Sequence, residues 1–211
     1  MTDEIKKLID GFRRFRVKYF EKDPELFQQL NTSGQSPKTL IIGCSDSRAD
    51  PALLTKAEPG DIFVMRNVAR LVPPYEVGGG LHGVSSTIEF AVKILKVDNV
   101  IVLGHEQCGG IRALLEGTYD QDQGSFISSW MRIAKEAKME VLQEIPNASL
   151  KEQLHLCAEK AVLISMENLM TFPFIQESMS RGELKLFGWF FDLEGGRLLE
   201  FNFEKRKFIE I

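Results

Sequence analysis

Three short apolar runs constrain the fold more than any other feature of this 211-residue sequence. They are TLIIGC at 39–44, DIFVMR at 61–66 and NVIVLG at 99–104. Each is rich in β-branched residues and has few polar positions, which is the composition of strands that are buried on both faces. A chain with such strands must cover both faces of its sheet, and helices usually provide that cover.

A helical pattern separates the second run from the third. Within residues 84–97, helical spacing relates the apolar side chains Val84, Ile88, Ala91, Val92 and Leu95. Strand, helix and strand in this order predict an α/β fold with a mostly parallel central β-sheet flanked by helices. Further helices are predicted at 122–139 and 149–170. The runs at 186–191 and 198–203 predict a terminal hairpin.

The first 31 residues predict an N-terminal helical arm. One face of a helix over residues 3–20 gathers the apolar side chains Ile5, Leu8, Ile9, Phe12 and Phe15. The other face is charged, so the helix has to cover either its own domain or a partner. A short second helix is predicted after Asp23-Pro24. The length and the lack of a linker predict a single domain over 1–211 that includes this arm.

Charge and cysteine content exclude several classes of protein. The net charge of −4 and the pI near 5.5 speak against nucleic acid or an anionic membrane as a partner. No run approaches the ~18 apolar residues of a membrane helix, and the charged start does not resemble a signal peptide. Three widely spaced cysteines favour a reducing, cytoplasmic setting over a disulfide framework. The mixed-sign stretch at 204–208 is expected to be a solvated edge.

The ends of the predicted strands carry residues that bind metals. Cys44 ends the first run and His105 follows the third, and the carboxyl ends of parallel strands meet at one edge of a sheet. A tight turn into a helix brings Cys108 to the same side as His105. Two sulfurs and one imidazole are ligands that Zn²⁺ favours, and three protein ligands leave a fourth position for water. The sequence therefore predicts a catalytic rather than a structural zinc site.

The same residues could also have a purely structural role. Cys44 and Cys108 could be small buried hydrophobic residues or could form a disulfide. A closed structural zinc site would need a fourth ligand, for which His82, His155 and Cys157 are the spare candidates. Cys157 lies inside a predicted helix, and we expect it to be a core thiol.

An acid and a base follow Cys44 at two-residue steps. Asp46 and Arg48 could form an ordinary surface ion pair, which contributes little. Next to a metal site, Arg48 can instead restrain Asp46 through a charge-assisted contact. The carboxylate can then accept a hydrogen bond from metal-bound water. The helix start at Gly109-Gly110 adds free N–H groups that favour an anion such as bicarbonate.

Four ordered motifs together resemble the β-class carbonic anhydrases. They are CSDSR at 44–48, EPGDIFVMRNVA at 58–69, SSTIEFAV at 85–92 and GHEQCGG at 104–110. The resemblance implies that Cys44, His105 and Cys108 bind one Zn²⁺ per chain and that Asp46 and Arg48 are the catalytic dyad. It also implies reversible hydration of carbon dioxide to bicarbonate and a proton by a zinc-bound hydroxide, in a homodimer or homotetramer.

The resemblance extends to finer features of the pocket. GQSPK at 34–38 resembles the plant-type branch, in which the residue matching Gln35 hydrogen-bonds the substrate. Phe63 and Phe90 match positions of the pocket wall. Glu106 and Arg70 depart from the family pattern and are expected to add charge near the cleft. Another branch has a tryptophan where this chain has Ile41, so inhibition by bicarbonate at a separate site is not expected.

Two other functions remain open from sequence. The same scaffold could hydrolyse carbonyl sulfide or carbon disulfide. A zinc- or redox-responsive binding protein could use Cys44 and Cys108 as a switch, although such a protein has no need for the Asp46–Arg48 pair.

Overall fold

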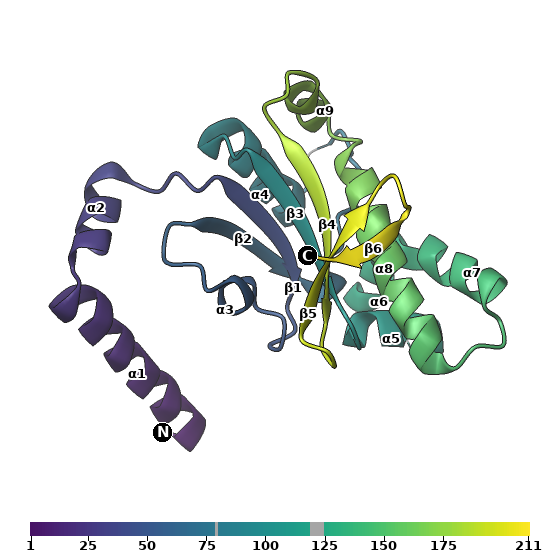
Figure 1. The fold of residues 1–211 in the computed structure, drawn as a ribbon, viewed down its shortest axis with the longest axis horizontal. Coiled ribbons are helices and arrows are strands. Elements are labelled where there is room, and N and C mark those ends of the chain that lie inside the picture. Colours follow the sequence, from purple (N-terminus) through teal and green to yellow (C-terminus); the bar gives the residue numbers. More distant parts are fainter. Residues whose placement is uncertain (79, 119–124) are drawn as a thin grey trace. The chain divides into compact units, whose positions relative to one another are not determined.

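The computed structural model describes residues 1–78, 80–118 and 125–211 (Figure 1). The chain divides into two compact units, Met1–Ser36 and Pro37–Ile211. In the part of the chain that the structure describes, no helix is both long and apolar enough to cross a membrane.

The first unit is helical throughout most of its length. Helix α1 (Asp3–Arg16) continues as the π-helix Val17–Lys22, and α2 (Glu25–Ser33) follows. The predicted helix at 3–20 and the second helix after Pro24 are therefore confirmed. Near the end of the first helix, four aromatic rings contact one another: Phe15, Tyr19, Phe20 and Phe27. Leu8 and Phe12 stay exposed on α1.

The second unit is built on one six-stranded sheet. Its strands are β1 (Thr39–Cys44), β2 (Ile62–Asn67), β3 (Asn99–His105), β4 (Lys185–Asp192), β5 (Arg197–Asn202) and β6 (Lys207–Glu210). Their order across the sheet is β2-β1-β3-β4-β5-β6. The first four are parallel, and β5 and β6 add to the edge as antiparallel strands. The predicted α/β class and the hairpin of β4 and β5 are confirmed.

Alternate residues of the central strands face opposite sides of the sheet. Leu40 and Ile42 of β1 enter the main core, as do Val100 and Val102 of β3. Side chains one position along these strands form a smaller cluster, which contains Ile41, Ile101 and Leu103. Both faces are thus apolar, which explains why these strands show no polar alternation.

Helices supply the cover that the apolar faces require. They are α3 (Pro51–Thr55), α4 (Gly83–Glu89) with the π-helix Phe90–Leu95, α5 (Gly109–Glu116), α6 (Phe126–Met131), α7 (Lys135–Glu144), α8 (Leu150–Leu169) and α9 (Pro173–Ser180). The long α8 runs across β3 and β4 (Figure 1). It buries Leu154, Ala158, Val162 and Leu169 in the main core.

Two details differ from the expectations. The first three residues of the helix predicted over 122–139 lie outside the described residues. The described part of this segment forms two helices, α6 and α7, which are joined by a 3-10 turn at Arg132–Ala134. Helix α7 runs on to Glu144 because Ala137 and Val141 pack into the core. The expectation of a solvated edge at 204–208 is wrong at its end, since Lys207 begins β6 and Phe208 packs against the core.

Candidate metal centre

The strand register brings the predicted ligands to one edge of the sheet. Gly43 of β1 pairs with Leu103 of β3, so Cys44 and His105 both lie at the carboxyl ends of their strands. Cys108 is the N-cap of α5. One ligand atom from each of these three residues lies within 4.8 Å of the other two, and all three residues are buried.

The geometry of the cluster fits a tetrahedral zinc ion. The sulfurs of Cys44 and Cys108 are 3.9 Å apart, close to the ~3.8 Å that two Zn–S bonds of ~2.3 Å would give. His105 Nδ1 lies 2.8 Å from the Glu106 carbonyl oxygen and must carry the proton, because that oxygen can only accept. His105 Nε2 is buried and has no hydrogen-bond partner among the described residues. A metal ion would satisfy that nitrogen.

The pKa values of the two cysteine thiols also favour binding of a cation. The hydrogen bond between them lowers the pKa of the Cys108 thiol and raises the pKa of the Cys44 thiol. A divalent cation would replace the shared proton and let both sulfurs bind as thiolates. All three cysteines are free, so the disulfide alternative is wrong. Cys157 is a buried core thiol as expected, and desolvation raises its pKa to about 12.

Asp46 and Arg48 form a two-pronged ion pair beside this cluster. Arg48 Nε donates to Asp46 Oδ1 at 3.0 Å, and Nη2 donates to Oδ2 at 2.8 Å. The Arg48 backbone N–H adds a third hydrogen bond to Oδ1. The side-chain hydrogen bond from Arg48 is the largest cause that lowers the pKa of Asp46 well below its usual range. The carboxylate is therefore ionised and held in place.

Arg66 is a residue of the site that sequence reasoning missed. From the end of β2, its guanidinium donates to the carbonyl oxygens of Cys44 at 2.8 Å and Asp46 at 2.7 Å, and it pairs with Asp50. Asp50 also caps α3. One arginine thus fixes the whole loop after β1. The sequence offered only a partial signal, since Arg66 ends the apolar run at 61–66; the structure shows that this strand pairs with β1.

Arg70 is completely buried, so the charge that it was expected to add near the cleft lies inside the core. Its Nη2 donates to the Ala158 carbonyl oxygen of α8 at 2.5 Å, whereas Nε and Nη1 have no partner in the described part of the chain. Its positive charge contributes to lowering the pKa of Cys108. Arg70 and Ala69 both adopt left-handed backbone conformations, with φ of 51° and 61°.

The start of α5 requires one of its two glycines. A Cβ on Gly110 would lie 2.9 Å from Val68 Cγ1 and 3.2 Å from Ala69 Cβ, whereas on Gly109 it would meet nothing within 4 Å among the described residues.

We expect Gly110→Ala to lower the free energy of unfolding by ~1–3 kcal/mol through overpacking, and Gly109→Ala to leave it nearly unchanged. Urea unfolding of both variants measures the difference. Equal unfolding midpoints would contradict this close packing.

Two of the remaining predicted pocket residues, Phe63 and Phe90, lie away from the cluster. Phe63 and Phe90 contact each other, with ring centroids 5.9 Å apart. Phe63 pairs with Leu40, four positions before Cys44, and is therefore ~13 Å away along the strand. Gln35 is exposed at the end of the first unit. The roles of these three residues remain predictions.

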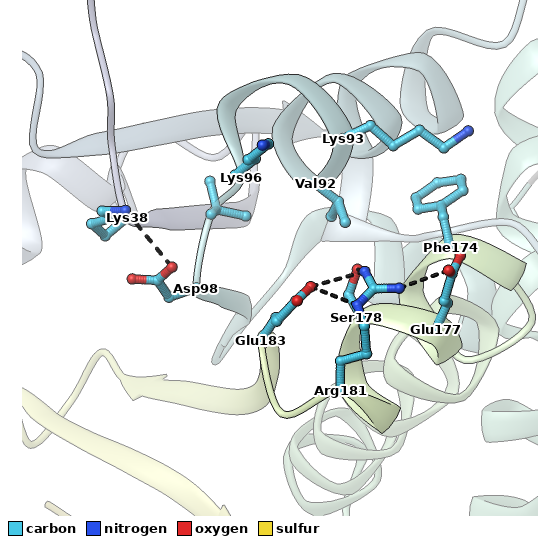
Figure 2. Close-up of a pocket in the computed structure, with 11 residues that line it drawn as sticks. Lys38, Val92, Lys93, Lys96, Asp98, Phe174, Glu177, Ser178, Arg181 and Glu183 are labelled. Carbon is cyan, nitrogen blue, oxygen red and sulfur yellow. Dashed lines mark hydrogen bonds and ion pairs between the residues drawn. The ribbon is translucent and has the colours of Figure 1, made fainter.

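A large pocket lies at the opposite end of the strands (Figure 2). It has a volume of about 590 Å³, and its lining includes Lys38 before β1 and Asp98 before β3. Lys38 pairs with Asp98, and Arg181 pairs with Glu177 and Glu183. These side chains pair with one another, and the pocket lies at the end of the strands remote from Cys44 and His105, so it is not the candidate site.

The fold and the cluster define an α/β protein with a buried Cys₂His metal-type site and a restrained carboxylate beside it. The chain also matches the family model described as carbonic anhydrase over residues 39–198. It is 34% identical to a carbonic anhydrase of Synechococcus elongatus over 94% of this chain and 72% of that protein. Against beta carbonic anhydrase 3 of Arabidopsis thaliana, identity is 33% over 92% of this chain and 75% of that protein.

Solved structures agree with the sequence relatives. The β-carbonic anhydrase CcaA matches with a TM-score of 0.92 and 32% identity, over 100% of this chain and 93% of that one. A tetrameric β-carbonic anhydrase of Sordaria macrospora matches with a TM-score of 0.83 and 30% identity, over 94% and 97% of the two chains. The chain belongs to the β class of the carbonic anhydrase family, and it is an enzyme of that class.

Proposed function

We propose that this protein catalyses the zinc-dependent, reversible hydration of carbon dioxide to bicarbonate and a proton. The observation that carries the proposal is the convergence of Cys44, His105 and Cys108 within 4.8 Å, beside an acid that an arginine restrains. Zinc, held by these three residues, would supply a bound water of lowered pKa.

The residues around the cluster would orient the attacking oxygen, restrain the acid and bind bicarbonate. Asp46 is ionised and can only accept, so it orients the attacking oxygen by taking a hydrogen bond from it. Arg48 holds both carboxylate oxygens and also donates to the Gln107 carbonyl oxygen at 3.2 Å, which keeps the acid away from the metal position. The backbone N–H of Gly109, the first residue of α5, would bind an oxygen of bicarbonate. The released proton passes to solvent or buffer.

The test combines zinc content per chain with stopped-flow hydration of carbon dioxide. We expect one zinc per chain and a hydration rate that rises as the pH increases from about 6 to about 9. The rise follows because the attacking oxygen must lose a proton near neutral or alkaline pH before it can react. A rate that stays flat across this range, or purified protein that takes up no zinc, would count against the proposal.

The two other functions make different predictions in the same assay. Carbonyl sulfide or carbon disulfide as the true substrate would give faster turnover than carbon dioxide. A redox-responsive zinc protein would release its metal on oxidation of Cys44 and Cys108 and would show no hydration. The two-pronged Asp46–Arg48 contact supports an enzyme, since a metal-release switch does not need a restrained acid.

We further propose a homodimer or homotetramer in the cytoplasm. The solved relative from Sordaria macrospora is tetrameric by its description. Large apolar side chains of the first unit remain exposed, among them Ile5, Leu8, Phe12 and Phe20, as expected of a surface that another chain covers. The three free cysteines suit a reducing compartment.

A further inference from the structure

His155 lies outside the metal cluster but is connected to it by hydrogen bonds. From α8, its Nδ1 is 2.9 Å from Glu106 Oε1 and its Nε2 is 3.4 Å from Glu159 Oε1. Carboxylates accept hydrogen bonds, so both ring nitrogens donate when the imidazole is protonated. The ring also packs edge-on against Phe190 of β4, with centroids 5.3 Å apart. His155 is therefore held between α8, the sheet and the loop that carries the ligands.

Glu106 is the residue that this contact holds in place. It directly follows His105, and its backbone N–H donates to the Phe191 carbonyl oxygen at 3.1 Å. Its own carbonyl oxygen lies 2.8 Å from His105 Nδ1. Its side chain is 15% exposed and accepts from His155. Three contacts thus fix the one carbonyl group that determines which nitrogen of His105 carries the proton.

We propose that His155 is a positioning residue of the metal site, which acts through Glu106 to keep the His105 ring oriented with Nε2 toward the metal. This inference rests on the proposed zinc site. Partners of metal-ligating histidines fix the tautomer and the ring orientation, and their loss typically costs ~10–100-fold in metal affinity. A glutamate at this position, which departs from the family pattern, gives the chain a link from its ligand loop to α8.

The contact depends on the charge of His155. The hydrogen bond to Glu159 is the largest cause that raises the pKa of His155 above 6.5, and Glu106 adds to it. His155 and Glu106 line a cavity of about 250 Å³ that Lys151 of α8 and Arg112 of α5 also line. These two cations pair with other carboxylates, Lys151 with Glu194 and Arg112 with Glu116. Because the folded-state pKa is raised, the charged pair is present below the ordinary histidine pKa and is lost as the pH rises through the raised value.

A double-mutant cycle on zinc release tests the proposal. Wild type, Glu106→Gln, His155→Gln and the double variant are loaded with one zinc per chain, and a chelator in excess then measures the release rate. At pH about 6.5 we expect each single variant to release zinc ~10-fold faster and the double variant to be no faster than either. As the pH rises, the coupling between the two sites should weaken, because loss of the charge of His155 leaves at most a neutral hydrogen bond to Glu106. Since acid loss of the ligands is common to all four proteins, it cancels in the cycle.

Glu140→Gln is the matched control. It removes a carboxylate that pairs with Lys160 of the same helix α8 without touching His155 or the ligand loop, and we expect a release rate within ~3-fold of wild type at pH about 6.5. Additive effects of Glu106→Gln and His155→Gln, or a coupling that does not change with pH, would overturn the proposal. In that case one zinc per chain and normal hydration in wild type would leave the proposed function standing. A wild-type protein without zinc would remove both.

Discussion

Replacement of Cys44 by serine is expected to abolish stable zinc binding. A serine hydroxyl is a poor substitute for a thiolate, and the remaining Cys108 and His105 would leave only two protein ligands. We expect zinc affinity to fall by more than ~100-fold, since loss of an outer partner alone costs ~10–100-fold. Hydration activity should fall with it. Competition with a chromogenic chelator measures the affinity.

Cys157→Ser is the control for the Cys44 variant. Cys157 is equally a buried thiol, but it lies in α8 outside the cluster. This variant should lose some stability, because a buried hydroxyl replaces the thiol, and still bind one zinc per chain. A Cys44→Ser protein that is fully loaded and active would overturn the ligand assignment.

Arg48→Ala is expected to separate catalysis from metal binding. Zinc should remain near one per chain, because all three ligand residues are intact. Asp46 would lose the side-chain hydrogen bonds that restrain both of its oxygens and would compete for the open metal position. We expect hydration to fall by ~10²–10⁴-fold, the range that a positioned acid or base contributes. Stopped-flow rates on the zinc-loaded variant measure the loss.

Arg181→Ala is a matched comparison for Arg48→Ala. The two arginines have similarly exposed side chains, 46% and 48%, and both pair with carboxylates. Arg181, however, lies just before β4, at the opposite end of the strands from the cluster. Its loss should leave hydration unchanged. Near-normal turnover in Arg48→Ala would reject the restraint of Asp46.

The class of fold and the type of site could be predicted because they depend on local chemistry. A strand that is buried on both faces has to be apolar at every position, so TLIIGC and NVIVLG could be recognised without coordinates. Residues at the carboxyl ends of adjacent parallel strands meet, so the approach of Cys44 to His105 could also be expected. The approach of Cys108 to the same site could be expected because Cys108 lies three residues after His105, in a tight turn that enters a helix.

What could not be predicted depends on contacts between distant segments. Sequence reasoning expected Arg70 to add charge near the cleft, but it could not show that α8 packs over this residue and buries it completely. The start of β6 was predicted as solvated, because a basic stretch does not reveal the strand with which it pairs.

The sequence by itself determined which ligand types this protein offers, where strands β1 to β5 lie and that Asp46 and Arg48 accompany the first ligand. Only the tertiary structure decided how that set is held. Arg66 reaches the Cys44 and Asp46 carbonyl oxygens from a neighbouring strand, and His155 reaches Glu106 across 49 positions. The physical reason is that the chemistry of a side chain depends on its residue type alone. Its partners depend on the register of the sheet and on which face of α8 packs against the sheet.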